Sequence, residues 1–142
     1  MLKKTIKSID FDGNEREEDY YFNITKTEIT KLQLSHDGGI TKKLERITQS
    51  KSAPEMLAVI EEFIDLSYGV KSDNGKYFTK TPEALAEFKS SAAYDEFFMD
   101  ITSNTASMVA FITGILPADI SGKIQQDEEF KNKVKQLSEA NK

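Results

Sequence analysis

The chain opens with a stretch of extended character and continues with apolar residues at helical spacing. In the first stretch the apolar positions are spaced irregularly: Leu2, Ile6, Ile9 and Phe11. In the second, Tyr20, Phe22 and Ile24 share one face of a strand. Residues 12–14 form an Asp-Gly-Asn turn between them. We therefore expect a β-hairpin over residues 2–24. Because an isolated hairpin is only marginally stable, its apolar face must cover helices or pair with another copy.

Helix start signals recur through the rest of the chain. Thr25 and Glu28 have the spacing of a capping box, and Pro54 and Thr81-Pro82 mark two further first turns. Asn104 precedes the most apolar segment. Together with periodic segments near residues 40–47 and 94–101, these signals predict about six short-to-medium helices. The predicted fold class is α+β, mainly α-helical, with the N-terminal hairpin packed in one domain.

The stretch from Phe63 to Phe78 separates the central helix from the next helical block. Gly69 stands where a helix commonly ends in the left-handed conformation. Asp73, Asn74 and Gly75 supply the residues that a tight turn needs. We expect a helix terminus followed by a reversal of the chain.

The C-terminal part of the chain is more polar than the rest. It keeps a thin apolar line: Ile120, Ile124, Phe130, Val134 and Leu137. Acidic residues come first and lysines later, which suits the dipole of one amphipathic helix. We predict a globular body over residues 1–117, made of the hairpin 2–24 and a helical body 25–117. An amphipathic helical tail over 118–142, which docks when a partner is present, follows it.

Composition narrows the class of function. The 142 residues include 38% hydrophobic and 30% charged residues, a profile of one ordinary folded domain. A net charge of -5 without a basic patch argues against nucleic acid as a partner. The longest apolar run, residues 106–116, is too short to cross a bilayer, so no membrane association is expected. The absence of cysteine is consistent with a reducing cytoplasm.

Residues that could carry out catalysis are sparse. His36 is the single histidine, and a solvated turn histidine is the simpler interpretation. A calcium loop aligned on Gly75 would place Val70 and Thr81 at ligand positions that need carboxylates. Paired acids lie on the polar sides of amphipathic patterns, and no phosphate-binding or hydrolase motif occurs. We expect no enzyme, no metal and no cofactor.

Aromatic residues are numerous for a small helical domain. Neighbours such as Tyr20, Tyr21 and Phe22, or Phe97 and Phe98, cannot all point the same way. Some of them therefore leave the core face. They form either a groove or assembly surface, or a small satellite core.

Four blocks in order carry a resemblance that spans residues 9–117. They are DFDGNEREEDYYFNITKTEI (Asp10–Ile29), SYGVKSDNGKYFTK (Ser67–Lys80), AYDEFFMDI (Ala93–Ile101) and FITGILP (Phe111–Pro117). This sequence resembles the tail assembly chaperones of siphophages and prophages of Gram-positive bacteria. None of the blocks is a catalytic signature, so the resemblance rests on their number and order.

The resemblance implies a non-enzymatic protein of the host cell cytoplasm. It would bind the tape measure protein, keep it soluble and promote assembly of the tail tube. Further implied partners are the tail tube protein and a longer form of the chain made by a ribosomal frameshift. Two alternatives stay open, namely a structural tail or connector subunit retained in the virion and a regulator that binds a host protein.

A chaperone for a helical rod needs apolar contact surfaces, and self-association would multiply weak contacts. We therefore expect a homo-oligomer. The predicted contact surface is formed by two groups of residues. They are the tail stripe Phe130, Val134 and Leu137, and the aromatic corner Tyr68, Tyr77 and Phe78.

Overall fold

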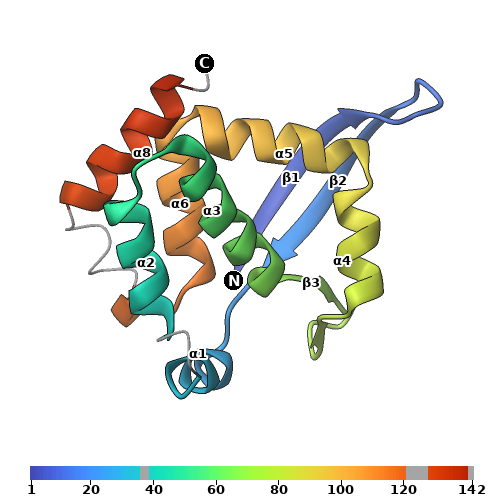
Figure 1. Cartoon of the computed structure of the whole chain (residues 1–142). Helices are drawn as coiled ribbons and strands as arrows, with labels where there is room; N and C mark the ends of the chain where they lie inside the picture. The colour runs from blue at the N-terminus through green and yellow to red at the C-terminus, as the bar shows by residue number, and fades with distance from the viewer. Residues whose placement is uncertain (36–38, 121–127, 141–142) are drawn as a thin grey trace.

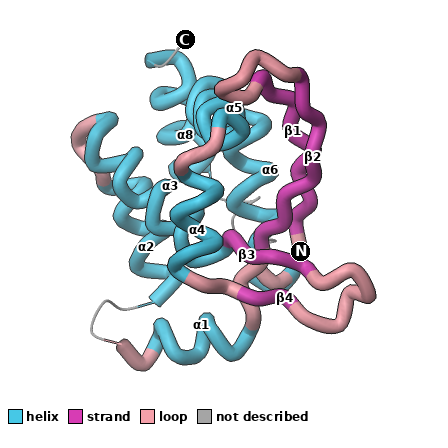
Figure 2. Tube along the Cα trace, turned by 90° about the vertical axis from the view of Figure 1, so that its right-hand side faces the viewer, coloured by secondary structure: helices cyan, strands magenta, loops and turns pink. Residues whose placement is uncertain are grey.

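The computed structural model describes residues 1–35, 39–120 and 128–140. A small antiparallel sheet lies along one side of a bundle of helices (Figures 1 and 2). The fold is α+β and mainly helical, which confirms the predicted class. The segments around His36 and from residue 121 to 127 lie outside the described residues, so the prediction for that histidine stays untested.

The predicted hairpin is present at the N-terminus. Strand β1 (Leu2–Ile9) pairs antiparallel with β2 (Glu15–Phe22) along its whole length. The turn between them contains Gly13, whose φ of 86° is in the left-handed region. The Asp10 carboxylate accepts hydrogen bonds from the backbone of Asp12 and Asn14, at 3.0 and 2.9 Å. These bonds give the tip of the hairpin a defined shape, and the tip projects beyond the helices (Figure 1).

Two short strands extend the sheet to the order β1-β2-β3-β4. Strand β3 (Tyr68–Lys71) follows the central helix directly, and β4 (Phe78–Thr79) pairs with it antiparallel. The sequence predicts only a helix terminus and a turn here. The prediction of a left-handed Gly69 was wrong, because the described glycines with positive φ are Gly13, Gly39 and Gly75.

Gly69 is required for a different reason. A Cβ at this position would lie 2.7 Å from Cζ of Phe78 and 3.0 Å from the carbonyl oxygen of Thr79. The ring of Phe78 therefore occupies the space that a side chain would need. Gly75, by contrast, has a φ of 76°, which confirms the predicted turn at residues 73–75.

The helices begin where the local signals predict. Their bounds are α1 (Lys26–Gln33), α2 (Gly39–Gln49), α3 (Ala53–Ser67), α4 (Pro82–Lys89), α5 (Ala92–Ser103), α6 (Thr105–Ile115) and α8 (Glu128–Ala140). Thr25 and Glu28 form the complete capping box of α1. Thr81 and Asn104 cap α4 and α6, and each accepts a hydrogen bond from the backbone amide three residues on. Short-range chemistry thus sets the boundaries of these helices.

Aromatic rings join the sheet to the helices. Phe22 of β2 is fully buried, and its ring stacks on Phe97 of α5 with centroids 4.9 Å apart. Phe111 of α6 meets the same ring edge-on at 5.6 Å, and Phe88 of α4 at 5.8 Å. One residue of the hairpin therefore contacts three helices. Since aromatic burial is a large contribution to core stability, this cluster holds the sheet on the bundle.

Neighbouring residues in the two aromatic runs differ in burial. Phe97 is in the core, whereas Phe98 is only half-buried and packs near Tyr94 at 5.9 Å. Tyr21 is half-buried on the sheet, with the Lys71 ammonium 5.3 Å from its ring centroid. Phe98 and Tyr21 are thus the partly exposed members of the two aromatic runs.

Candidate partner-binding surfaces

Helix α8 carries the predicted tail stripe, and the structure places it against the body. The stripe residues follow the helical spacing i, i+4 and i+7, and all three are buried: Phe130 at 1%, Val134 at 1% and Leu137 at 4% exposure. The helix lies against α2, α3, α5 and α6 (Figure 1). The apolar face of the tail is therefore part of the core in this conformation.

Two polar contacts accompany this packing. Lys133 Nζ donates a 2.9 Å hydrogen bond to the carbonyl oxygen of Ser50, at the end of α2. Thr105 Oγ1, at the start of α6, donates to Ser138 Oγ at 3.0 Å. Ser138 in turn donates to the carbonyl oxygen of Val134 within α8. Helix α8 is thus fixed to the body at two places along its length.

Surface pockets flank α8 on both sides. One, of about 170 Å³, lies between α8 and the α2–α3 connection and is lined in part by Ser50, Met56 and Leu137. The other, of about 280 Å³, lies between α8 and the α5–α6 junction beside Thr105 and Ser138. The helix therefore occupies a groove that is open along both of its edges.

The burial of Phe130, Val134 and Leu137 limits how they can contact a partner. Their role in binding stays a prediction, and it requires α8 to leave the groove. A charged residue at position 130 or 137 would also disturb the core. Such substitutions therefore cannot separate loss of binding from loss of stability.

The second predicted group belongs to strands β3 and β4 and the turn between them: Tyr68 begins β3, Tyr77 precedes β4 and Phe78 begins β4. Tyr68 is half-buried and stacks on Phe88 with ring centroids 4.4 Å apart, and this burial raises the pKa of its phenol. Phe78 is half-buried above Gly69. Only Tyr77 is well exposed, at 66%. The turn and α8 lie on opposite sides of the molecule, so the structure does not bring the two groups together (Figures 1 and 2).

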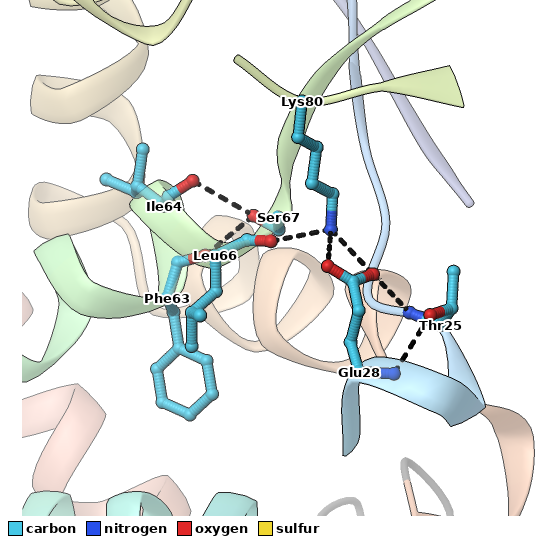
Figure 3. A network of polar contacts seen from close by, with 7 residues as sticks. All are labelled: Thr25, Glu28, Phe63, Ile64, Leu66, Ser67 and Lys80. Atoms are coloured by element: carbon cyan, nitrogen blue, oxygen red, sulfur yellow. Dashed lines mark hydrogen bonds and ion pairs between the residues drawn. The ribbon is translucent and has the colours of Figure 1, made fainter. Parts of the chain in front are cut away.

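A polar network fixes the β3–β4 turn to the helices (Figure 3). Lys80 Nζ donates to both carboxylate oxygens of Glu28, at 2.8 and 2.7 Å, and to the carbonyl oxygen of Leu66 at 2.7 Å. Burial opposes ionisation of Glu28. Hydrogen bonds from Lys80 and the Thr25 amide outweigh that effect and hold the pKa of the carboxyl below 4.5. The same lysine therefore stabilises the start of α1 and the end of α3.

Two exposed apolar residues on the hairpin are not among the contact residues predicted from the sequence. Phe11, at its tip, is 84% exposed, and Ile9 is 63% exposed. Their odd numbers set them out of phase with Leu2 and Ile6, which face the body. That change of phase was the available signal, because a strand turns alternate residues to opposite faces.

Neither a metal site nor a membrane span stands out in residues 1–35, 39–120 and 128–140. No group of three or more metal-ligating side chains gathers within those ranges. None of the helices there is long and apolar enough to cross a bilayer.

Comparison with known protein families identifies the family of this chain. The chain matches the family model described as phage tail assembly chaperone over residues 1–142. Neither the curated proteins nor the solved structures give a significant match. Because the match covers the whole chain, this protein belongs to the phage tail assembly chaperone family.

Proposed function

We propose that this protein binds the tape measure protein of its phage, keeps that protein soluble and promotes assembly of the tail tube around it. Membership of the tail assembly chaperone family supports the role in tail assembly. The proposed place of action is the host cell cytoplasm. The proposed activity is binding alone, without catalysis or a cofactor.

The observation that supports this proposal most directly is the position of α8 in its groove. Three apolar side chains at helical spacing fill a groove between α2, α5 and α6. A groove that accepts one amphipathic helix has the shape and polarity to accept another. The tape measure protein is expected to be a long helical rod, so it would offer many such helices.

Exchange of helices in this groove is energetically plausible. Burying a large apolar side chain contributes about 1.5–3 kcal/mol. A partner helix with a similar stripe would recover most of what α8 loses on leaving. The displaced α8 would expose Phe130, Val134 and Leu137, which then add a second apolar strip for the partner. We propose this exchange as the way in which the predicted tail stripe takes part in binding.

The β3–β4 turn offers a smaller surface that needs no rearrangement. Tyr77 and Val70 are exposed at 66% and 50%, and Lys80 anchors the strand that carries Phe78. A fixed, exposed aromatic side chain is a common anchor in protein interfaces. We propose this turn as an auxiliary contact for the tape measure protein. Further proposed partners are the tail tube protein, a frameshifted longer form and other copies of this chain.

Co-expression tests this function directly. The tape measure protein encoded by the same phage is expressed alone and together with the present chain, and its soluble fraction is measured. We expect it to be insoluble alone, and soluble and co-purified when the chain is present. An insoluble tape measure protein, together with the chain in purified mature particles, would instead favour a structural tail subunit.

A further inference from the structure

Among the residues that the structure describes, no strand pairs with two of the hairpin's edges. Strand β1 is the terminal strand of the sheet, so one of its edges faces no other strand. Strand β2 pairs with β3 only at Tyr21 and Phe22. Residues 15–20 of β2 therefore have no described strand beside them on the side away from β1. The two strands run along one side of the helices, and the tip of the hairpin projects beyond them (Figure 1).

Two backbone hydrogen bonds identify the groups that point outward. The amide of Asp10 donates to the carbonyl oxygen of Asn14 across the hairpin, at 2.9 Å. The amide of Asn23 donates to Ser67 on the opposite side of β2, at 2.8 Å. In antiparallel strands the direction of the backbone groups alternates from residue to residue. Even-numbered residues of the hairpin therefore bond across it, and odd-numbered residues direct their backbone groups to the free edges.

The outward-directed residues differ in charge between the two edges. On β1 they are Lys3, Thr5, Lys7 and Ile9. On the unpaired part of β2 they are Glu15, Glu17 and Asp19. All seven are exposed. One edge is therefore basic and apolar, whereas the other is acidic.

This difference in charge determines which strand can pair with each free edge. Two β1 edges would bring lysines together, and two β2 edges would bring acids together, which destabilises strand pairing. A β1 edge against a β2 edge brings opposite charges together. Within one chain Lys3 Nζ already lies 3.5 Å from Asp19 Oδ2, so this pair forms on this face of the sheet.

We propose that copies of this chain associate by strand addition, with β1 of one copy pairing antiparallel to the free edge of β2 of the next. In the favoured register, Lys3 is opposite Asp19 and Lys7 is opposite Glu15 of the neighbouring copy. Thr5 is then opposite Glu17. Backbone hydrogen bonds between the strands provide the affinity, and the charged side chains determine which edge pairs with which.

The interface uses two different surfaces on each copy. A head-to-tail contact of this kind generates a ring when the rotation closes and an open chain of copies when it does not. The lysines on the edge of β1 discourage pairing of like edges, as edge charges do in other sheets. Because the charges are exposed, salt weakens the association. This inference does not depend on binding of the tape measure protein.

Charge reversal at one pair of positions tests the interface. Lys7→Glu and Glu15→Lys each place like charges opposite one another in the proposed register. From the usual range for cross-strand charge pairs, each should weaken self-association roughly two- to thirtyfold in low salt. Lys42→Glu, on the exposed face of α2, makes the same change in net charge as Lys7→Glu and should have no effect. The measurement is sedimentation velocity over a range of concentrations.

An equimolar mixture of the two variants gives the decisive result. In the mixture, β1 of each variant can pair with β2 of the other variant, and positions 7 and 15 then carry opposite charges. The mixture should therefore regain wild-type self-association. Circular dichroism checks the fold, and Glu15→Lys stands alone as the test if Lys7→Glu unfolds the hairpin. A wild-type chain that stays monomeric in low salt would overturn the proposal. Self-association that neither variant weakens, or a mixture of two folded variants that does not recover, would overturn it as well.

Discussion

Lys80 and Glu28, separated by 52 positions in the sequence, form an ion pair in which Nζ lies 2.7 Å from Oε2. The same ammonium group donates to the carbonyl oxygen of Leu66, near the end of α3. Glu28 also belongs to the capping box of α1. The Lys80 side chain thus connects the segment that follows β4 with α1 and α3, and it fixes the base of the turn that exposes Tyr77 (Figure 3).

The pair predicts a specific dependence of stability on pH. The pKa of Glu28 is lowered in the folded protein, so its contribution is present above the ordinary value of 4.5. That contribution is lost as pH falls below 4.5 through the folded pKa. Replacing Glu28 with Gln should therefore lower the melting temperature near neutral pH and flatten its fall on acidification. Thermal melts from pH 7 to about pH 3 measure the difference between variant and wild type.

Lys80→Met is the matched test of the partner. Without the ammonium group, the pKa of Glu28 should return toward its ordinary value, and its share of the acid dependence should shrink. Acid profiles for Glu28→Gln and Lys80→Met that both coincide with the wild-type profile would show that the pair contributes nothing to stability.

Phe22 predicts a large effect on stability. It is fully buried and contacts rings from α4, α5 and α6. Phe22→Ala should lower the free energy of unfolding by about 3–5 kcal/mol, measured by urea denaturation. Phe11→Ala removes the same side chain from an exposed position and should change it by less than about 0.5 kcal/mol. Equal effects at the two sites would contradict the placement of the hairpin.

Gly69 predicts a steric effect. A methyl group at this position would lie 2.7 Å from Cζ of Phe78, so Gly69→Ala should destabilise the fold by about 1–3 kcal/mol. Phe78→Ala in the same chain removes the nearest obstacle. The cost of the Gly69 substitution should then fall, and the two changes should be non-additive in urea denaturation. Additive effects would mean that the ring does not occupy this space.

Local signals account for the helices that the sequence predicted. Three of these helices have a cap directly before their first residue: Thr25, with Glu28, for α1; Thr81, with Pro82, for α4; and Asn104 for α6. Such bonds form within one turn of the chain and depend little on the rest of the fold. The boundaries could therefore be derived before any packing was known.

The missed features depend on contacts between distant segments. Strands β3 and β4 are 4 and 2 residues long, too short for an alternation pattern. Strand β3 forms because β2 lies beside it, and β4 in turn pairs with β3. A glycine at position 69 is compatible with a left-handed helix end and also with a close contact to Phe78. The sequence alone does not distinguish these two reasons for a glycine. The stripe on α8 shows in sequence that one face is apolar. It does not show that the chain's own helices cover that face.

A disulfide across the α6–α8 contact tests the proposed exchange of helices. The hydroxyl oxygens of Thr105 and Ser138 lie 3.0 Å apart, and the chain contains no cysteine. The double variant Thr105→Cys with Ser138→Cys therefore permits one disulfide that holds α8 in its groove. Wild-type protein under the same redox conditions and the two single variants are the controls.

The most direct measurement compares how much tape measure protein the oxidised and reduced forms of this double variant capture. We predict that the oxidised form captures little, that reduction restores capture to the wild-type amount, and that the controls do not respond to reduction. Equal capture by the oxidised and reduced forms would contradict the account, because binding would then occur with α8 still in place.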